Sequence, residues 1–123
     1  MKLNTTKILK LDNALQLLVG VAMVAGEVDA QGDVIDDYEL TKAAMNAMGA
    51  GVKIDHQGGA VGRVVQSLAL TADLAAALGL PEPEQAVWIV GLKVDDPATW
   101  ARVRAGELNG GLSIGGRANT EQI

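Results

Sequence analysis

Residues 52–70 read VKIDHQGGAVGRVVQSLAL, a pattern that predicts a β-hairpin. Residues 52–56 and 61–70 are rich in Val, Ile and Leu, which favour strands. Between them, Gln57-Gly58-Gly59 has the composition of a tight turn. We therefore predict two strands that pair across a turn at residues 57–59. The first of these strands ends with His56, the only histidine in the chain.

The residues before this hairpin predict further strands and an acidic loop. Residues 1–14 are interpreted as a short leader or a first strand. Residues 15–28 are rich in Leu and Val and are interrupted by Gly20 and Gly26, so we expect a buried strand with a bulge or bend. The turn residues at positions 29–33 then form a loop that carries two carboxylates.

A helix is predicted between this loop and the hairpin. Asp36 or Asp37 can cap it, because a carboxylate accepts hydrogen bonds from the free amide groups of the first turn. The helix is expected to run to about Met48, and Gly49 stops it. Its apolar residues recur at spacings of three and four and form one inward stripe: Leu40, Ala43, Ala44, Ala47 and Met48.

Downstream of the hairpin, helical and strand patterns alternate. Thr71 or Asp73 begins an Ala-rich helical turn that ends at Gly79. Residues 86–94 predict a buried strand. A pair of aspartates follows, and Pro97 then takes the first position of a helix, where its missing amide hydrogen costs nothing.

The last predicted element is a short strand at residues 112–114, flanked on both sides by a pair of glycines. The elements together are mostly strands with two or three helices, which indicates an α+β fold. The chain has 123 residues, 49% of them hydrophobic, which suits one compact domain with one core.

Composition excludes several classes of function. The formal net charge of -5 provides no positive field for phosphates or anionic lipids, so we expect no nucleic-acid or membrane partner. Phe is absent, and the only aromatic residues, Tyr38, Trp88 and Trp100, cannot form a stacking platform for single strands. The chain has no cysteine, which excludes disulfides, thiolate metal sites and a cysteine nucleophile.

Nothing in the sequence indicates export or membrane insertion. The most apolar early stretch, residues 15–25, is shorter than the roughly 20 residues that a spanning helix needs. Acidic and polar residues flank it, which is a poor context for a signal peptide. We therefore expect an intracellular protein that is not secreted.

His56 and Ser113 are the two residues whose chemistry suits catalysis. His56 has the only side chain whose ordinary pKa lies near neutrality, so it is the first candidate for a general base. Asp55 cannot orient it from the neighbouring strand position unless a bulge intervenes, because successive side chains point to opposite faces. Ser113 lies in Gly-Gly-Leu-Ser-Ile-Gly-Gly, where the flanking glycines leave amide groups free to bind an oxyanion.

A metal site is a weaker interpretation of the acidic residues. Asp29, Asp33, Asp55 and His56 are hard or borderline ligands, but their spacing matches no known metal loop. We interpret the carboxylates as caps and turn residues, and expect no metal and no cofactor.

In combination, five segments resemble the prohead (capsid maturation) protease family of tailed phages, and especially its phage serine protease branch. The resemblance runs from about residue 15 to residue 118. The segments are VDAQGDVI (28–35), IDH (54–56), VGRVVQS (61–67), WIVGLKVDD (88–96) and GELNGGLSIGG (106–116).

This resemblance implies a fold like that of the herpesvirus assemblin protease, a small, mostly antiparallel β-barrel with helices packed around it. Residues 15–118 would form the single protease-like domain, and residues 119–123 a C-terminal tail. Ser113 would attack a peptide carbonyl and His56 would take its proton.

The third catalytic member remains open at this point. The second histidine of assemblin is excluded, because this chain has one histidine. The carboxylates that could replace it are Glu121, Asp29 and Asp33. The candidates for the oxyanion-binding loop are Gly115, Gly116 and Arg117.

The resemblance also implies a biological role. It is that of a serine endopeptidase that cleaves phage scaffold and major capsid proteins inside the assembling procapsid, in the host cytoplasm. Relatives of assemblin act as dimers, so a homodimer or a higher oligomer is one expectation for the assembly state. The alternative is a noncatalytic capsid-assembly or scaffold-associated binding module with the same fold.

Overall fold

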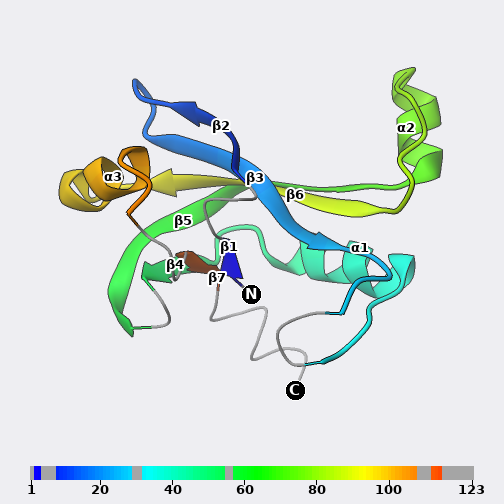
Figure 1. The fold of residues 1–123 in the computed structure, drawn as a ribbon, viewed down its shortest axis with the longest axis horizontal. Helices are drawn as coiled ribbons and strands as arrows, with labels where there is room; N and C mark the ends of the chain where they lie inside the picture. The colour runs from blue at the N-terminus through cyan, green and yellow to red at the C-terminus, as the bar shows by residue number, and fades with distance from the viewer. Residues whose placement is uncertain (1, 4–7, 29–31, 55–56, 108–111, 115–123) are drawn as a thin grey trace.

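The computed structural model describes residues 2–3, 8–28, 32–54, 57–107 and 112–114, which form one antiparallel sheet and three helices (Figure 1). The strand order is β1-β7-β4-β5-β6-β3-β2. The strands are β1 (Lys2–Leu3), β2 (Ile8–Asp12), β3 (Leu17–Val24), β4 (Gly51–Ile54), β5 (Gln57–Leu70), β6 (Val87–Val94) and β7 (Leu112–Ile114). The helices are α1 (Asp37–Asn46), α2 (Ala72–Leu78) and α3 (Pro97–Arg104). The predicted α+β class is confirmed.

The 14-residue strand β5 joins the two halves of the sheet. Its first part pairs with β4 and its later part with β6, and Gly62 is paired with both Val52 and Val94. A Cβ atom at Gly62 would lie 2.0 Å from the carbonyl oxygen of Lys93. Only glycine therefore permits the close backbone approach at the position where β5 passes from one partner strand to the other.

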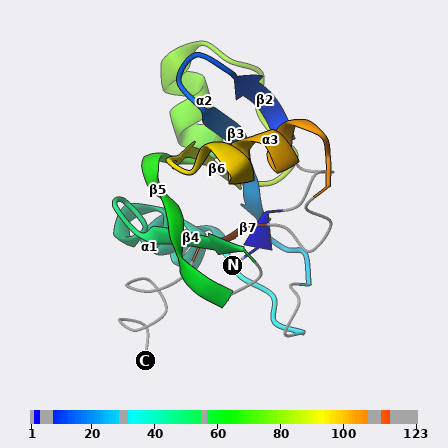
Figure 2. The same cartoon turned by 90° about the vertical axis from the view of Figure 1, so that its left-hand side faces the viewer.

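The sheet is curled into a half-barrel rather than the closed barrel that the resemblance implies. Figure 2 shows β5 running down one side of the molecule from β6 to β4. Among the described strands, β1 and β2 form the two ends of the sheet and do not pair with each other, although β1 approaches β3 to within 8 Å between Cα atoms.

The predicted hairpin is confirmed, but its predicted turn is wrong. Ile54 pairs with Gln57, so Gln57-Gly58-Gly59 belongs to β5 and only residues 55 and 56 separate the paired positions. The register shifts between Val52 and Ile54. Gly58 and Gly59 therefore lie in an irregular part of the β4–β5 pairing and do not form the turn. Gly58 has a φ of 71°.

The strand predicted over residues 15–28 is β3, and it is buried and bulged as expected. The register shifts between Val21 and Met23, whereas Gly20 keeps a regular partner in Val90 of β6. The bulge therefore does not fall on the glycine. The segment before it, residues 1–14, contains the two end strands β1 and β2.

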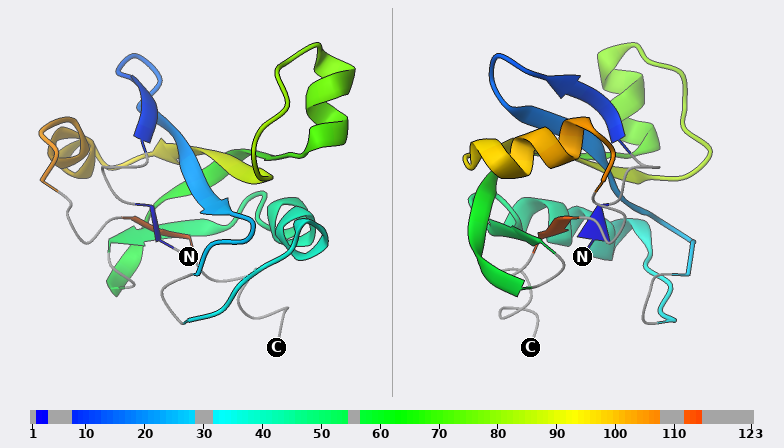
Figure 3. Two further views of the ribbon diagram at one scale, coloured as in Figure 1. Left: turned by 45° about the vertical axis from the view of Figure 1, so that its right-hand side comes forward. Right: turned by 60° about the vertical axis from the view of Figure 1, so that its left-hand side comes forward.

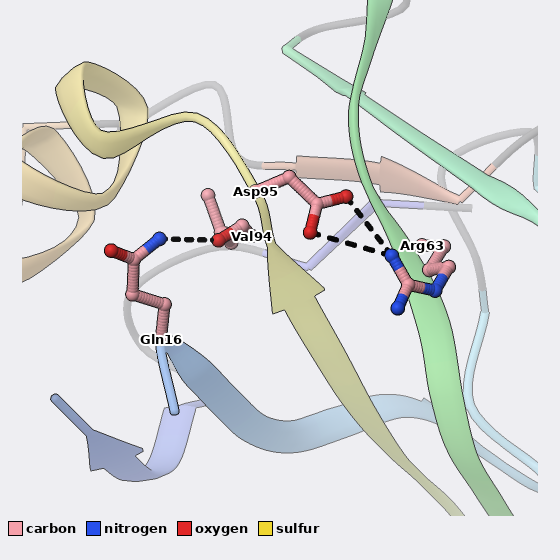
Figure 4. A network of polar contacts seen from close by, with 4 residues as sticks. All are labelled: Gln16, Arg63, Val94 and Asp95. Atoms are coloured by element: carbon pink, nitrogen blue, oxygen red, sulfur yellow. Dashed lines mark hydrogen bonds and ion pairs between the residues drawn. The ribbon is translucent and has the colours of Figure 1, made fainter. Parts of the chain in front are cut away.

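Polar contacts fix one end of β6 to its neighbours (Figure 4). The Gln16 side chain donates from Nε2 to the Val94 carbonyl at 2.6 Å, and the Val94 amide donates to the Gln16 carbonyl at 2.9 Å. On the β5 side, Arg63 forms an exposed ion pair with Asp95 at 3.1 Å. Exposed ion pairs contribute little stability, so the two hydrogen bonds between Gln16 and Val94 carry most of this attachment.

Helix α1 packs on the sheet through a hydrogen-bonded serine. The Trp88 indole on β6 donates to Ser67 Oγ on β5 at 2.9 Å, and Ser67 donates to the Ala44 carbonyl of α1 at 2.6 Å. Trp88 is 1% exposed, so Ser67 satisfies an indole that has no access to water. It also satisfies a carbonyl near the helix C-terminus.

The predicted start of α1 is confirmed, but its predicted apolar stripe is too long. Asp36 accepts a hydrogen bond from the Glu39 amide at 2.8 Å, as an N-cap does. Leu40, Ala44 and Ala47 are buried and Ala43 is partly buried. The helix ends at Asn46, so Met48 no longer follows the helical spacing and is 51% exposed.

The other two helices begin and end at the expected kinds of residue. Helix α2 ends at Gly79, which adopts the left-handed conformation with a φ of 73°. Helix α3 begins at Pro97, after Asp96 as its N-cap, and buries Trp100 against the sheet. In the described part of the chain, no helix has the length and apolar character needed to cross a membrane.

Candidate active site

Strand β7 lies in the interior of the sheet, between β4 and β1 (Figure 3). Ser113 is its middle residue. Its Cα partners are Lys53 on β4 and Lys2 on β1. The neighbouring residues Leu112 and Ile114 are buried in the hydrophobic core. Because side chains alternate along a strand, Ser113 projects from the opposite face of the sheet.

The hydroxyl group of Ser113 is buried and has no partner in the described part of the chain. The residue is 1% exposed, and among the described residues its Oγ has no hydrogen-bond partner. An unpaired buried hydroxyl costs about 1–3 kcal/mol. No contact among the described residues explains a serine here, and its O–H group remains available to donate to a general base.

Lys53 is a candidate functional residue that sequence analysis missed. It is exposed and lies directly opposite Ser113 across the β4–β7 pair. Directly opposed side chains share a face of the sheet, with Cβ atoms about 4.5–5.5 Å apart. A positive charge is therefore available beside Ser113. No local pattern reveals this, because the two strands are far apart in the chain.

His56 lies outside the described residues, but the path of β4 leads toward it. Ile54, the last residue of β4, pairs with Leu112, the residue before Ser113. His56 follows Ile54 by two positions in the sequence. The described backbone thus brings the chain close to β7 just before the histidine. The contact between His56 and Ser113 stays a prediction.

Of the remaining candidate site residues, the structure describes Asp33. Asp33 is exposed and lies in the loop that the bridge between Val28 and Val34 closes. Its role as third catalytic member stays a prediction. The other candidates lie outside the described residues: Asp29, Gly115, Gly116, Arg117 and Glu121.

The strand geometry also excludes one familiar serine motif. Residues 111–115 read Gly-Leu-Ser-Ile-Gly, which matches the spacing of a nucleophile elbow. An elbow requires the serine at a sharp turn between a strand and a helix. Ser113 is instead the middle residue of a strand that is paired on both sides. Ser113 therefore does not lie at a nucleophile elbow.

A separate acidic cleft of about 750 Å³ lies away from β7, between the start of α1 and the loop at residues 82–86. Its lining does not include Ser113, and it contains five carboxylates: Asp36, Asp37, Glu39, Glu82 and Glu84. Within the described ranges, no group of His, Asp and Glu residues could hold a metal ion.

Comparison with known proteins identifies the family. The family described as "Putative phage serine protease XkdF" matches residues 4–122 of the 123-residue chain. No match was found among curated proteins or among solved structures. The family match includes every strand from β2 to β7 and all three helices. The chain therefore belongs to this family of phage serine proteases.

Proposed function

We propose that this protein is a prohead maturation protease, a serine endopeptidase that cleaves phage scaffold and major capsid proteins. The observation that carries the proposal is the buried hydroxyl of Ser113, which has no hydrogen-bond partner among the described residues, in a chain of the phage serine protease family. The second support is the register of β4 with β7, which brings Ile54 beside Leu112 two residues before His56.

In the proposed reaction, His56 removes the proton from Ser113 Oγ as the oxygen bonds to the substrate carbonyl carbon. The carbonyl π electrons move onto oxygen and form a tetrahedral oxyanion, which amides near Gly115 and Gly116 stabilise, with Arg117 supporting the loop. His56 then protonates the leaving amine as the C–N bond breaks. Water, deprotonated by His56, hydrolyses the acyl-enzyme and restores Ser113.

The third member of the site is a carboxylate that orients the imidazole and stabilises its protonated form. The candidates are Glu121, Asp29 and Asp33. The half-barrel sheet with its three helices is compatible with an assemblin-like fold, and we include that likeness in the proposal.

The proposed setting is the assembling procapsid in the host cytoplasm. The protein would act there on scaffold and capsid subunits, as a homodimer or a higher oligomer. The net charge of -5 supports protein rather than nucleic-acid substrates, because phosphates would be repelled.

The test is covalent labelling of the purified protein with a fluorophosphonate probe. The chain has two serines, so Ser67→Ala is a matched control for Ser113→Ala. We expect labelling of the wild type and Ser67→Ala, and none of Ser113→Ala or His56→Ala. Because labelling is irreversible, incubation for hours with excess probe detects even a rarely exposed nucleophile.

Labelling must then be linked to cleavage. Co-expression with the scaffold and major capsid proteins of the same phage should yield discrete fragments with the wild type and intact proteins with Ser113→Ala. A folded wild type that is never labelled and cleaves neither protein would overturn the proposal. That result would favour the noncatalytic assembly module.

A further inference from the structure

The outer edge of β7, beside Ser113, is occupied by the chain's own strand β1. Lys2 pairs with Ser113 and Leu3 pairs with Leu112, in antiparallel register. The other edge of β7 is paired with β4 through three residues. Without β1, β7 would be the end strand of the sheet, with Ser113 at its centre.

An exposed strand edge is a binding site for an extended peptide. Its unpaired amides and carbonyls accept a further strand, and its side chains select the residues of the incoming peptide. A strand added to β7 would run about 4.8 Å from the backbone of Ser113. Endopeptidase substrates must be extended to present a peptide bond to the nucleophile. The edge of β7 is therefore suited to hold one.

We propose that the edge of β7 is the substrate-binding site, that its ligand is an extended peptide strand, and that β1 occupies it as an intramolecular competitor. This inference rests on the proposed protease function and adds its mode of regulation. Substrate and β1 exclude one another, since both require the same edge. Ser113 is 1% exposed with β1 in place. In the proposal, release of β1 frees the strand edge beside Ser113.

The length of β1 fits a competitor that can be displaced. It has two residues, whereas the β3–β6 pair is held by seven paired positions. A two-residue strand forms few hydrogen bonds, so its hold depends on being attached to the same chain, which keeps its local concentration high. A longer peptide strand can pair with all of β7 and displace it.

The first test locks β1 on β7. Leu3→Cys/Leu112→Cys places two cysteines at paired positions in a chain that otherwise has none, so only one intramolecular disulfide can form. We expect the oxidised variant to lose fluorophosphonate labelling of Ser113, and reduction to restore it. Lys10→Cys/Val19→Cys, a paired position on β2 and β3 at the other end of the sheet, should label equally in both states.

The second test loosens β1 and does not depend on the disulfide. Leu3→Pro removes a backbone donor and disfavours the pairing. We expect labelling about threefold faster or more than in the wild type. The matched control is Leu9→Pro in β2, at the opposite edge of the sheet, where the leucine is 61% exposed; it should label at the wild-type rate.

The outcomes separate this inference from the proposed function. Labelling at Ser113 that is insensitive to both oxidation and Leu3→Pro would overturn the role of β1 and leave the protease intact. Absence of labelling in the wild type, the reduced cysteine variant and Leu3→Pro would overturn both. Loss of Ser113 labelling on oxidation of the cysteine variant, together with faster labelling of Leu3→Pro, would establish β1 as the competitor.

Discussion

Lys53 of β4 lies directly opposite Ser113 of β7 in an antiparallel pair, so the two side chains share one face of the sheet. The lysine is exposed, and the serine is buried without a hydrogen-bond partner among the described residues. A positive charge beside a nucleophilic serine would stabilise the negative charge that develops on the substrate.

Removing the charge of Lys53 should slow the reaction of Ser113. We expect Lys53→Met to reduce the labelling rate and kcat/KM by about tenfold, less than loss of a buried oxyanion donor, because water and salt screen the exposed lysine. Lys53→Arg should retain most of the activity. Rates should be measured at low and high ionic strength, with Lys10→Met on the far strand β2 as the control. An unchanged rate in Lys53→Met would remove the lysine from the site.

Replacing Ser67 should weaken the attachment of α1 to the sheet. Ser67→Ala leaves the Trp88 indole and the Ala44 carbonyl without the partner that they share. We expect a loss of about 1–3 kcal/mol in the free energy of unfolding, measured with urea. Thr41→Ala, which removes an exposed hydroxyl bonded to the Asp37 carbonyl, should cost less. Equal losses in the two variants would contradict the bridging role of Ser67.

Adding one methyl group at Gly62 should disrupt the sheet, whereas adding it at Gly59 should not. A Cβ atom at Gly62 would meet the Lys93 carbonyl oxygen at 2.0 Å, so the β5 and β6 backbones must separate. We expect Gly62→Ala to lose about 3 kcal/mol or more in thermal or urea unfolding. At Gly59 nothing lies within 4 Å, and Gly59→Ala should be neutral or slightly stabilising. A stable Gly62→Ala would show that the two strands can move apart at little cost.

The cap of α3 should make stability depend on pH in the acid range. Hydrogen bonds from the Thr99 hydroxyl and amide lower the pKa of Asp96 below its ordinary value of 3.8. A carboxyl group with a lowered folded-state pKa stabilises the protein fully above its unfolded-state pKa, and this stabilisation is lost as the pH falls through the folded-state pKa.

Asp96→Asn keeps a capping oxygen but cannot titrate, so it isolates this effect. The difference in unfolding free energy between the wild type and Asp96→Asn should be constant above about pH 5 and change in favour of the variant at lower pH. Thr99→Val removes the hydroxyl donor, so the unfolding free energy of this variant should depend less on pH in the acid range. A difference that stays flat down to pH 2 would contradict the lowered pKa.

The features that sequence analysis predicted correctly are those decided by neighbouring residues. Asp36 caps α1, Gly79 ends α2, and Pro97 begins α3, because a cap or a fixed backbone angle acts within one helical turn. The strand at residues 112–114 was also predicted from its own apolar residues and the glycines around it.

The features that it missed depend on partners far away in the chain. The glycines at positions 58 and 59 look like a turn, but the register of β4 against β5 places them inside a strand. Lys53 has no local signal at all, since its significance arises only from pairing with Ser113. The same holds for β1, whose two residues gain a role from the strand beside which they lie.

The two ends of the sheet are connected by very little chain. Leu3 ends β1 at one edge and Ile8 begins β2 at the other, with four residues between them. Five residue steps span at most about 18 Å, so a released β1 remains tethered near the strand that it left. Closing so short a loop takes on the order of 10–100 ns, far faster than a probe or a peptide bond reacts. Strand β1 is therefore released and re-paired many times for each reaction at Ser113. The reaction rate will follow the equilibrium fraction of molecules in which β1 is released. This rate will rise in proportion to the probe concentration, without reaching a plateau set by the rate of β1 release.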